Sequence, residues 1–302
     1  MGSLALIAII ALAVFGAWRW SMDHRSAAVL DKVDSLFTGT LASQEVSFGE
    51  EPQQRLYVYG SHGDAARPVL VFFHGGSWSS GSAGEYGFIA RRYARDGFVV
   101  VLAGYRLGEA GRFPGMAEDG ARALAWTHAH IAEHGGDPGR VLLMGHSAGA
   151  YIAAMLALDR QWLGREGLDT DFIKGVVCLA GPFDFYPFDS PASRDAFGHY
   201  FRPEATQPIN FARGDAPPML LMTGDADTTV RPRNSIALAK ALTAAGTPAE
   251  PVILPNIGHI GILLRLASPF DLDGRVKRRV LAFLEQRAES GAASATVQPP
   301  GQ

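Results

Sequence analysis

A predicted strand that runs directly into a predicted helix places the tightest limit on how this chain can fold. Apolar residues at 141–144, rich in branched side chains, predict a short buried strand, and the Ala-rich run at 151–159 predicts the helix. Gly-His-Ser-Ala-Gly joins the two, and its glycines provide the small neighbours that so tight a turn requires. We therefore expect Ser147 to be a strained nucleophile at the end of a strand, beside the positive end of a helix.

Two later loops carry the side chains that such a nucleophile needs. An apolar run that predicts a strand precedes Asp225 and Asp227, and another precedes His259. A serine hydroxyl requires a base to accept its proton and a third group to orient that base. Serine, acid and histidine in this chain order, each just after a strand, are typical of a hydrolytic triad. Residue chemistry alone leaves both aspartates open as the acid.

An earlier loop predicts the remaining catalytic part. His-Gly-Gly-Ser-Trp at 74–78 follows a continuous apolar run, which suits a strand buried on both faces. Attack on a carbonyl creates an oxyanion, and preorganised amide N–H groups stabilise it. Glycines let the backbone approach a substrate closely. We predict an oxyanion hole made by the amides of Gly75, Gly76, Ser77 and Ala148.

The rest of the chain predicts an α/β fold. Apolar strands alternate with segments of helical period, which indicates a mainly parallel central sheet with helices on both faces. Ligands bind such sheets beyond the carboxyl ends of the strands. The aromatic-rich segment 181–215 interrupts the alternation and predicts either a small cap over an apolar pocket or a cluster that only covers the sheet edge. The predicted pocket residues are Trp78, His146, Phe183 and Phe185.

On these motifs the chain resembles the α/β-hydrolase superfamily over about residues 45–288, in particular its small carboxylesterases of the hormone-sensitive-lipase-like and feruloyl-esterase-like groups. Those enzymes carry an H-G-G-x-W or H-G-G-G loop. The Gly-Asp-Pro sequence at 136–138 also resembles a motif of these enzymes. The resemblance implies the α/β-hydrolase fold. It also favours Asp227 as the acid, because the acid of relatives commonly stands three residues before a valine, here Val230.

The resemblance implies a serine hydrolase that forms an acyl-enzyme on Ser147 and cleaves carboxylic esters with short-to-medium acyl or aryl groups. The H-G-G-x-W form is also similar to kynurenine formamidases, so an arylformamidase that cleaves N-formylkynurenine is the alternative. A non-catalytic binding module of the same fold would require a missing triad residue. We expect no cofactor and no metal. The net charge of −3 argues against a nucleic-acid partner, and the oligomeric state is left open.

The two ends of the chain lie outside the predicted catalytic domain at 45–289. Leu4 to Trp18 is fifteen residues without a charge, and we expect residues 1–20 to be an uncleaved membrane anchor rather than a cleaved signal peptide, with the side of the membrane open. Helical spacing of apolar residues predicts a connecting helix within 21–44. The Ala/Ser/Pro/Gly tail at 290–302 predicts disorder.

Overall fold

The computed structural model describes residues 26–60 and 66–295. The predicted membrane anchor at 1–20 lies outside these residues and stays a prediction. Among the helices of the described part, none combines the length and the apolar character that crossing a membrane requires.

The described residues form one sheet of eight strands in the order β1-β2-β4-β3-β5-β6-β7-β8. The first two neighbour pairs, β1 with β2 and β2 with β4, are antiparallel, and every later pair is parallel. This arrangement confirms the predicted mainly parallel sheet. The strands are β1 (Gln44–Ser47), β2 (Arg55–Tyr59), β3 (Arg67–Phe73), β4 (Val99–Ala103), β5 (Gly136–His146), β6 (Ile173–Leu179), β7 (Met219–Gly224) and β8 (Pro251–Leu254).

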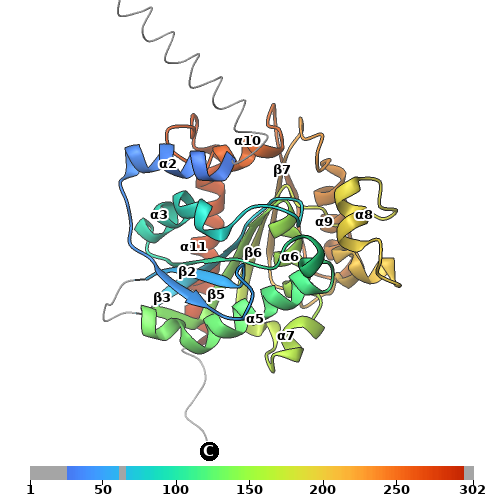
Figure 1. Cartoon of the computed structure of the whole chain (residues 1–302), viewed down its shortest axis with the longest axis horizontal. Helices are drawn as coiled ribbons and strands as arrows, with labels where there is room; N and C mark the ends of the chain where they lie inside the picture. The colour runs from blue at the N-terminus through green and yellow to red at the C-terminus, as the bar shows by residue number, and fades with distance from the viewer. Residues whose placement is uncertain (1–25, 61–65, 296–302) are drawn as a thin grey trace, which may run out of the picture.

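Helices cover both faces of the sheet (Figure 1). The α-helices are α2 (Ser26–Thr38), α3 (Gly87–Arg95), α4 (Gly108–Gly111), α5 (Gly115–His130), α6 (Ala148–Leu158), α7 (Gln161–Arg165), α8 (Pro191–Phe197), α9 (Arg233–Ala245), α10 (His259–Leu264) and α11 (Arg275–Ala295). Short 3-10 helices are η1 (Ala83–Tyr86), η2 (Ile131–His134), η3 (Thr170–Phe172), η4 (Pro203–Thr206) and η5 (Pro208–Phe211).

The central strands bury both of their faces because successive side chains point to opposite sides of the sheet. In β3, Val69 and Val71 belong to a core shared with α5, α6 and α9, whereas Leu70 and Phe72 belong to a core shared with α3 and α11. A strand with helices on both sides must be apolar throughout. This requirement explains the continuous apolar runs in the sequence.

Helix α11 ends later than the sequence predicts. It continues to Ala295, so the expectation of disorder from residue 290 onward is wrong for 290–295, and residues 296–302 lie outside the described part. The physical reason is composition, since the segment after Ser290 contains several alanines, which have the highest helix propensity.

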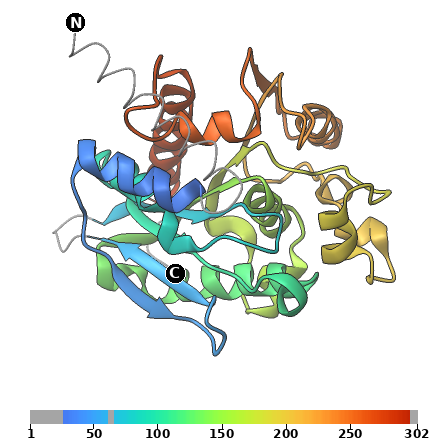
Figure 2. The ribbon, with the colours of Figure 1, turned by 45° about the horizontal axis from the view of Figure 1, so that its top comes forward.

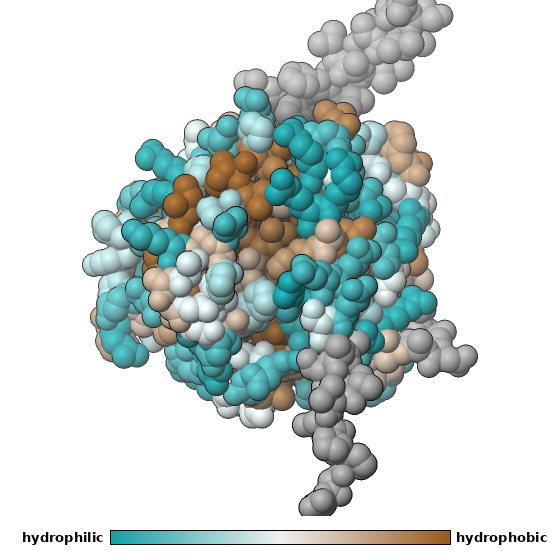
Figure 3. Space-filling view, turned by 180° about the vertical axis from the view of Figure 1, so that it is seen from behind, coloured by the Kyte–Doolittle hydropathy of each residue, from teal (hydrophilic) through white to brown (hydrophobic). Residues whose placement is uncertain are grey.

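Strand β8 forms one edge of the sheet, and its Ile253 is 38% exposed. The face of the molecule seen from behind carries a group of apolar side chains in its upper part, with hydrophilic side chains around it (Figure 3). Arg275, Arg278 and Arg279 line a groove beside β8. A four-residue edge strand flanked by cations is a poor template for pairing with another chain.

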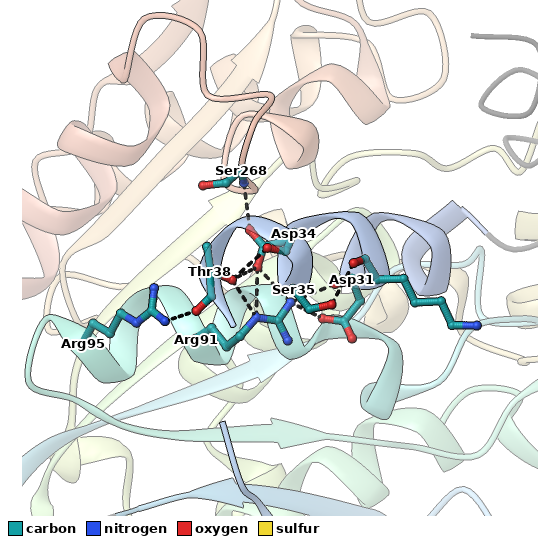
Figure 4. A network of polar contacts seen from close by, with 8 residues as sticks. Asp31, Asp34, Ser35, Thr38, Arg91, Arg95 and Ser268 are labelled. Carbon is teal, nitrogen blue, oxygen red and sulfur yellow. Dashed lines mark hydrogen bonds and ion pairs between the residues drawn. The ribbon is translucent and has the colours of Figure 1, made fainter. Parts of the chain in front are cut away.

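Helix α2 packs beside α3 (Figure 2), and a buried ion pair fastens it to the rest of the fold (Figure 4). Arg91 of α3 donates to Asp34 from Nε (3.0 Å) and from Nη2 (2.8 Å). The same Asp34 accepts from the backbone N–H of Ser268, in the connection between α10 and α11 (2.8 Å). Asp31 adds a second carboxylate to Arg91 at 2.8 Å. One aspartate therefore joins α2 to two other parts of the fold.

We expect Arg91→Leu to lower the free energy of unfolding by about 3–5 kcal/mol, because it leaves the charge of Asp34 buried without its partner. The side chains of this pair are only 7% and 4% exposed. Arg92→Leu on the same helix is the control. Its pair with Asp96 is longer, at 3.4 Å, and more exposed, so its loss costs about 1 kcal/mol at most. Urea unfolding measures both, and equal losses would contradict the structural role of Arg91.

Candidate active site

The turn between β5 and α6 holds Ser147 in a backbone conformation that is rare for a residue with a side chain. Its φ is 54° and its ψ is −120°. The strain is held in place from both sides, because the Ser147 N–H donates to the Leu179 carbonyl at 2.9 Å and α6 begins at the next residue. This geometry confirms the predicted strand-turn-helix and directs the serine side chain away from the strand.

Two glycines make this turn possible because the backbone passes too close for any side chain. A Cβ atom on Gly149 would lie 2.0 Å from the Phe73 carbonyl oxygen, at the end of β3. A Cβ atom on Gly145 would lie 2.3 Å from the carbonyl carbon of Gly149. The G-x-S-x-G spacing is therefore a packing requirement between α6 and the neighbouring strand.

Three side chains from separate loops meet in one hydrogen-bonded chain. The Ser147 hydroxyl donates to His259 Nε2 at 2.9 Å, and His259 Nδ1 donates to Asp227 Oδ2 at 2.8 Å. The other carboxylate oxygen of Asp227 accepts from the backbone N–H groups of Thr229 (2.9 Å) and Val230 (2.8 Å). These two backbone amides fix the orientation of the carboxylate.

The structure separates the two aspartates that residue chemistry left open. Asp227 is 3% exposed and contacts the histidine. Asp225 is exposed, and its side chain accepts from the backbone N–H of Asn256 at 2.7 Å, which tightens the loop before His259. Among the described residues, only Asp227 gives His259 a carboxylate partner.

The glycine-rich loop after β3 packs against the serine. A Cβ atom on Gly75 would lie 3.3 Å from Ser147 Cβ, a tight contact that a glycine avoids. Gly76 has a φ of 126°, and Ser77 also has a positive φ, so the loop turns sharply. Ser77 and Ala148 line the same cavity as Ser147. Three of the four residues predicted for an oxyanion hole, Gly75, Ser77 and Ala148, therefore lie beside the serine, and Gly76 belongs to the same loop.

A stack of rings supports this loop from behind. The His74 ring lies between Tyr105 (ring centroids 4.5 Å apart) and Tyr86 (5.9 Å). Burial lowers the pKa of His74 to about 4, so the ring is neutral, and its Nδ1 donates to the Gly75 carbonyl at 2.7 Å. The Tyr105 hydroxyl donates to the His74 carbonyl at 2.9 Å. No motif in the sequence marks these two tyrosines.

His146 does not line the substrate cavity, which corrects its predicted role. It is buried, and its Nε2 donates to the backbone carbonyl of His259 at 3.1 Å. Burial, and then the nearby His259, lower the pKa of His146 to about 3. The residue before the serine alternates to the opposite side of the strand, so its ring supports the histidine loop instead of facing the cavity.

The cavity beside Ser147 has a volume of about 450 Å³. Trp78 and Phe185 line it, as predicted, but Phe183 does not. Phe183 is completely buried in the core between the sheet and the helices, because Gly181 and the first residues of the insertion turn its ring inward. Polar and charged side chains complete the wall, and they come from the insertion, the loop after β7 and the start of α9.

The insertion at 181–215 is attached to this cavity by aromatic and polar contacts. Trp78 packs edge-on against Phe197 (4.8 Å) and is stacked on Phe185 (6.1 Å). Asn234 Oδ1 accepts from the amides of Phe183 and Asp184 (2.9 and 3.0 Å), and Gln207 Oε1 accepts from the next two amides (2.8 and 3.1 Å). The segment therefore caps the cavity and packs on the core at once. No motif in the sequence marks Asn234 or Gln207 as a partner of the insertion.

No group of three or more His, Cys, Asp or Glu side chains in the described part of the chain is placed to hold a metal ion. The one cysteine, Cys178, is buried in β6, and burial raises the pKa of its thiol, so it stays protonated. The candidate reactive groups of this site are the serine, histidine and aspartate described above.

We expect the protein to lose stability as the pH falls from 6.5 to 4.5. The pKa of His146 is lowered in the folded state, so only the unfolded chain takes up its proton in this range, and His146 contributes a loss of about 2 kcal/mol. His146→Gln should flatten the dependence by about that amount in urea unfolding at both pH values. Ile152→Val, a buried change without a titrating group, should lower stability equally at both. An unchanged slope in the glutamine variant would contradict the assignment.

Comparisons with known proteins agree with this fold and with the predicted resemblance. The BD-FAE family model matches residues 56–242. The isoprenylcysteine alpha-carbonyl methylesterase of Arabidopsis thaliana is 27% identical over 76% of this chain and 59% of its own length, and the esterase LipC of Mycobacterium tuberculosis is 28% identical over 72% and 59%. The chain thus spans about three fifths of the length of these relatives.

Solved structures show the same architecture. A truncated carbohydrate esterase from gut microbiota superposes with a TM-score of 0.71 at 19% identity, over 83% of this chain and 97% of that one. The propionate-bound esterase of Thermogutta terrifontis superposes with a TM-score of 0.68 at 22% identity, over 86% of this chain and 97% of that one. At these identities the likeness is one of fold. Because the family model covers more than half of the chain, the protein belongs to the BD-FAE family and has the α/β-hydrolase fold.

Proposed function

We propose that the protein is a carboxylesterase that uses Ser147 as its nucleophile. The observation that carries this proposal is the hydrogen-bonded chain from the Ser147 hydroxyl through His259 to Asp227, with distances of 2.9 and 2.8 Å. The names of the relatives support it, since an isoprenylcysteine methylesterase, esterases and a carboxylesterase are among them.

In this mechanism His259 takes the proton of Ser147 while the oxygen attacks the ester carbonyl. The resulting imidazolium is stabilised by the carboxylate of Asp227, which also holds the ring in the tautomer with hydrogen on Nδ1. His259 then returns the proton to the leaving alcohol, and an acyl-enzyme remains. Water, activated by the same imidazole, attacks the acyl group and restores the serine.

The tetrahedral oxyanion needs amide donors beside the serine. Ala148 is the first residue of α6, so its N–H has no acceptor within the helix and lies at the positive end of the helix dipole. The loop of Gly75, Gly76 and Ser77 packs on the other side of Ser147. We assign the oxyanion hole to these amides. Each such donor contributes about 3–4 kcal/mol to transition-state stabilisation.

The size and lining of the cavity suit short-to-medium acyl or aryl esters. A cavity of about 450 Å³ lies toward the small end of the range for ligand pockets. Trp78 and Phe185 provide apolar surface next to the serine. Long acyl chains would have to extend out of this space.

Ser147→Ala should lower the kcat for p-nitrophenyl butyrate by at least about 10⁴-fold, because no other group can form the acyl-enzyme. Its melting temperature should change little, since only one small polar atom is lost. A fluorophosphonate probe should label the wild type at residue 147 and leave the variant unlabelled. Folded wild-type protein without this label would refute the serine mechanism.

Asp227→Asn should lower kcat by about 10⁴-fold, because the amide no longer holds the histidine tautomer or balances its charge. Asp225→Asn is the matched control on the same loop, and it should retain kcat within about tenfold, since that side chain bonds only the amide of Asn256. Steady-state kinetics on one ester compares the two. A larger loss in the residue 225 variant would reassign the acid.

Formamide hydrolysis uses the same groups, so substrate preference is tested separately. We expect the kcat/KM for p-nitrophenyl acetate and butyrate to exceed that for N-formylkynurenine. A large advantage for the formamide would make the protein an arylformamidase and would leave the roles of Ser147, Asp227 and His259 unchanged.

A further inference from the structure

The cavity that contains Ser147 is lined by two arginines whose side chains have no partner among the described residues. Arg231 lies in the loop after Asp227, Arg233 is the first residue of α9, and both line the cavity that contains Ser147. Both are exposed. Neither side chain forms an ion pair or a hydrogen bond with any residue in the described part of the chain.

Most of the other described arginines are engaged. They pair with carboxylates, bond backbone carbonyls or cover aromatic rings, as Arg91, Arg194 and Arg202 do respectively. The positive wall is also local, because the chain as a whole has a net charge of −3. Two guanidinium groups separated by one residue repel each other when no anion lies between them. The two neighbouring guanidinium groups would therefore stabilise a bound anion more than they stabilise the folded protein.

The lining of the same cavity carries one compensating charge. Asp189, in the insertion, is the one carboxylate within the cavity lining that the described residues form. Helix α8 of the insertion and the first turn of α9 both contribute residues to the lining of this one cavity. Two positive charges against one negative charge leave the cavity with an excess of positive charge next to the scissile bond.

We propose that Arg231 and Arg233 bind an anionic group of the substrate, so that the preferred esters carry a carboxylate. This inference rests on the proposed esterase function. Guanidinium groups bind carboxylates through paired N–H donors, which gives orientation as well as attraction. Apolar contacts with Trp78 and Phe185 hold the rest of the substrate while the arginines hold its charged end.

The test compares esters that differ only in this charge. Mono-4-nitrophenyl glutarate and 4-nitrophenyl valerate have acyl chains of similar length, and only the first ends in a carboxylate. Butyrate esters of 4-hydroxybenzoate and of its methyl ester place the charge in the leaving group instead. The double variant Arg231→Gln/Arg233→Gln should lower kcat/KM about tenfold for the charged member of one of these pairs, and less than twofold for both neutral esters.

Lys240→Gln is the matched control, because Lys240 is an exposed cation on the same helix that does not line the cavity. This variant should leave the ratio of kcat/KM between the charged and the neutral member of each pair unchanged. Raising the salt concentration should reduce the wild-type preference, since exposed charges are screened over about 10 Å at 0.1 M. The double variant Arg231→Glu/Arg233→Glu should lower the kcat/KM for the charged ester further than the double glutamine variant does.

The outcomes separate this inference from the esterase proposal. Suppose that the wild type hydrolyses the neutral esters and that the double variant loses activity equally, or not at all, on the charged and neutral members. This result overturns the arginine assignment and leaves the esterase function standing. Absence of turnover for all four esters refutes the esterase function itself. Activity on the neutral esters also reports that each variant is folded.

Discussion

The close approach of α6 to the end of β3 is the constraint on which the site depends. Gly149 comes so near the Phe73 carbonyl that no side chain fits between them, and this contact forces the turn in which Ser147 adopts its strained conformation. The same approach brings the loop at 74–78 against the serine. The proposed nucleophile and the amides beside it are thus positioned by backbone packing, which reorganises little when a substrate binds.

Around this contact the site is supported by buried, neutral polar groups. His74 and His146 are both uncharged because burial lowers the pKa of each ring, and each donates to a backbone carbonyl of a catalytic loop. A neutral ring with a satisfied N–H costs little to bury, whereas a charged one would be expensive. These histidines therefore hold the loops of Gly75 and His259 without adding a charge that would compete with the triad.

The insertion gives the cavity its shape and its unequal walls. Asn234 holds the beginning of the insertion from α9, so the helix that carries Arg233 also positions the segment that carries Asp189. A substitution of Asn234 would therefore displace both parts of the cavity lining, the insertion and the start of α9, together. In the proposed function, chemistry and selectivity are separated. The groups proposed for hydrolysis follow β5, β7 and β8, whereas the arginines proposed to bind the charge of the substrate lie just before α9 and at its first residue.

The sequence by itself determined the strands, the serine turn and the order of the triad, because these depend on local periodicity and on glycines that no other residue can replace. The choice of Asp227 over Asp225 needed the fold, since both follow the same strand and only the loop geometry brings one to the histidine. The fold also decided which aromatic residues face the cavity. Phe183 and Phe185 look alike in a sequence, but the direction of a ring in an irregular insertion depends on contacts with residues far away along the chain.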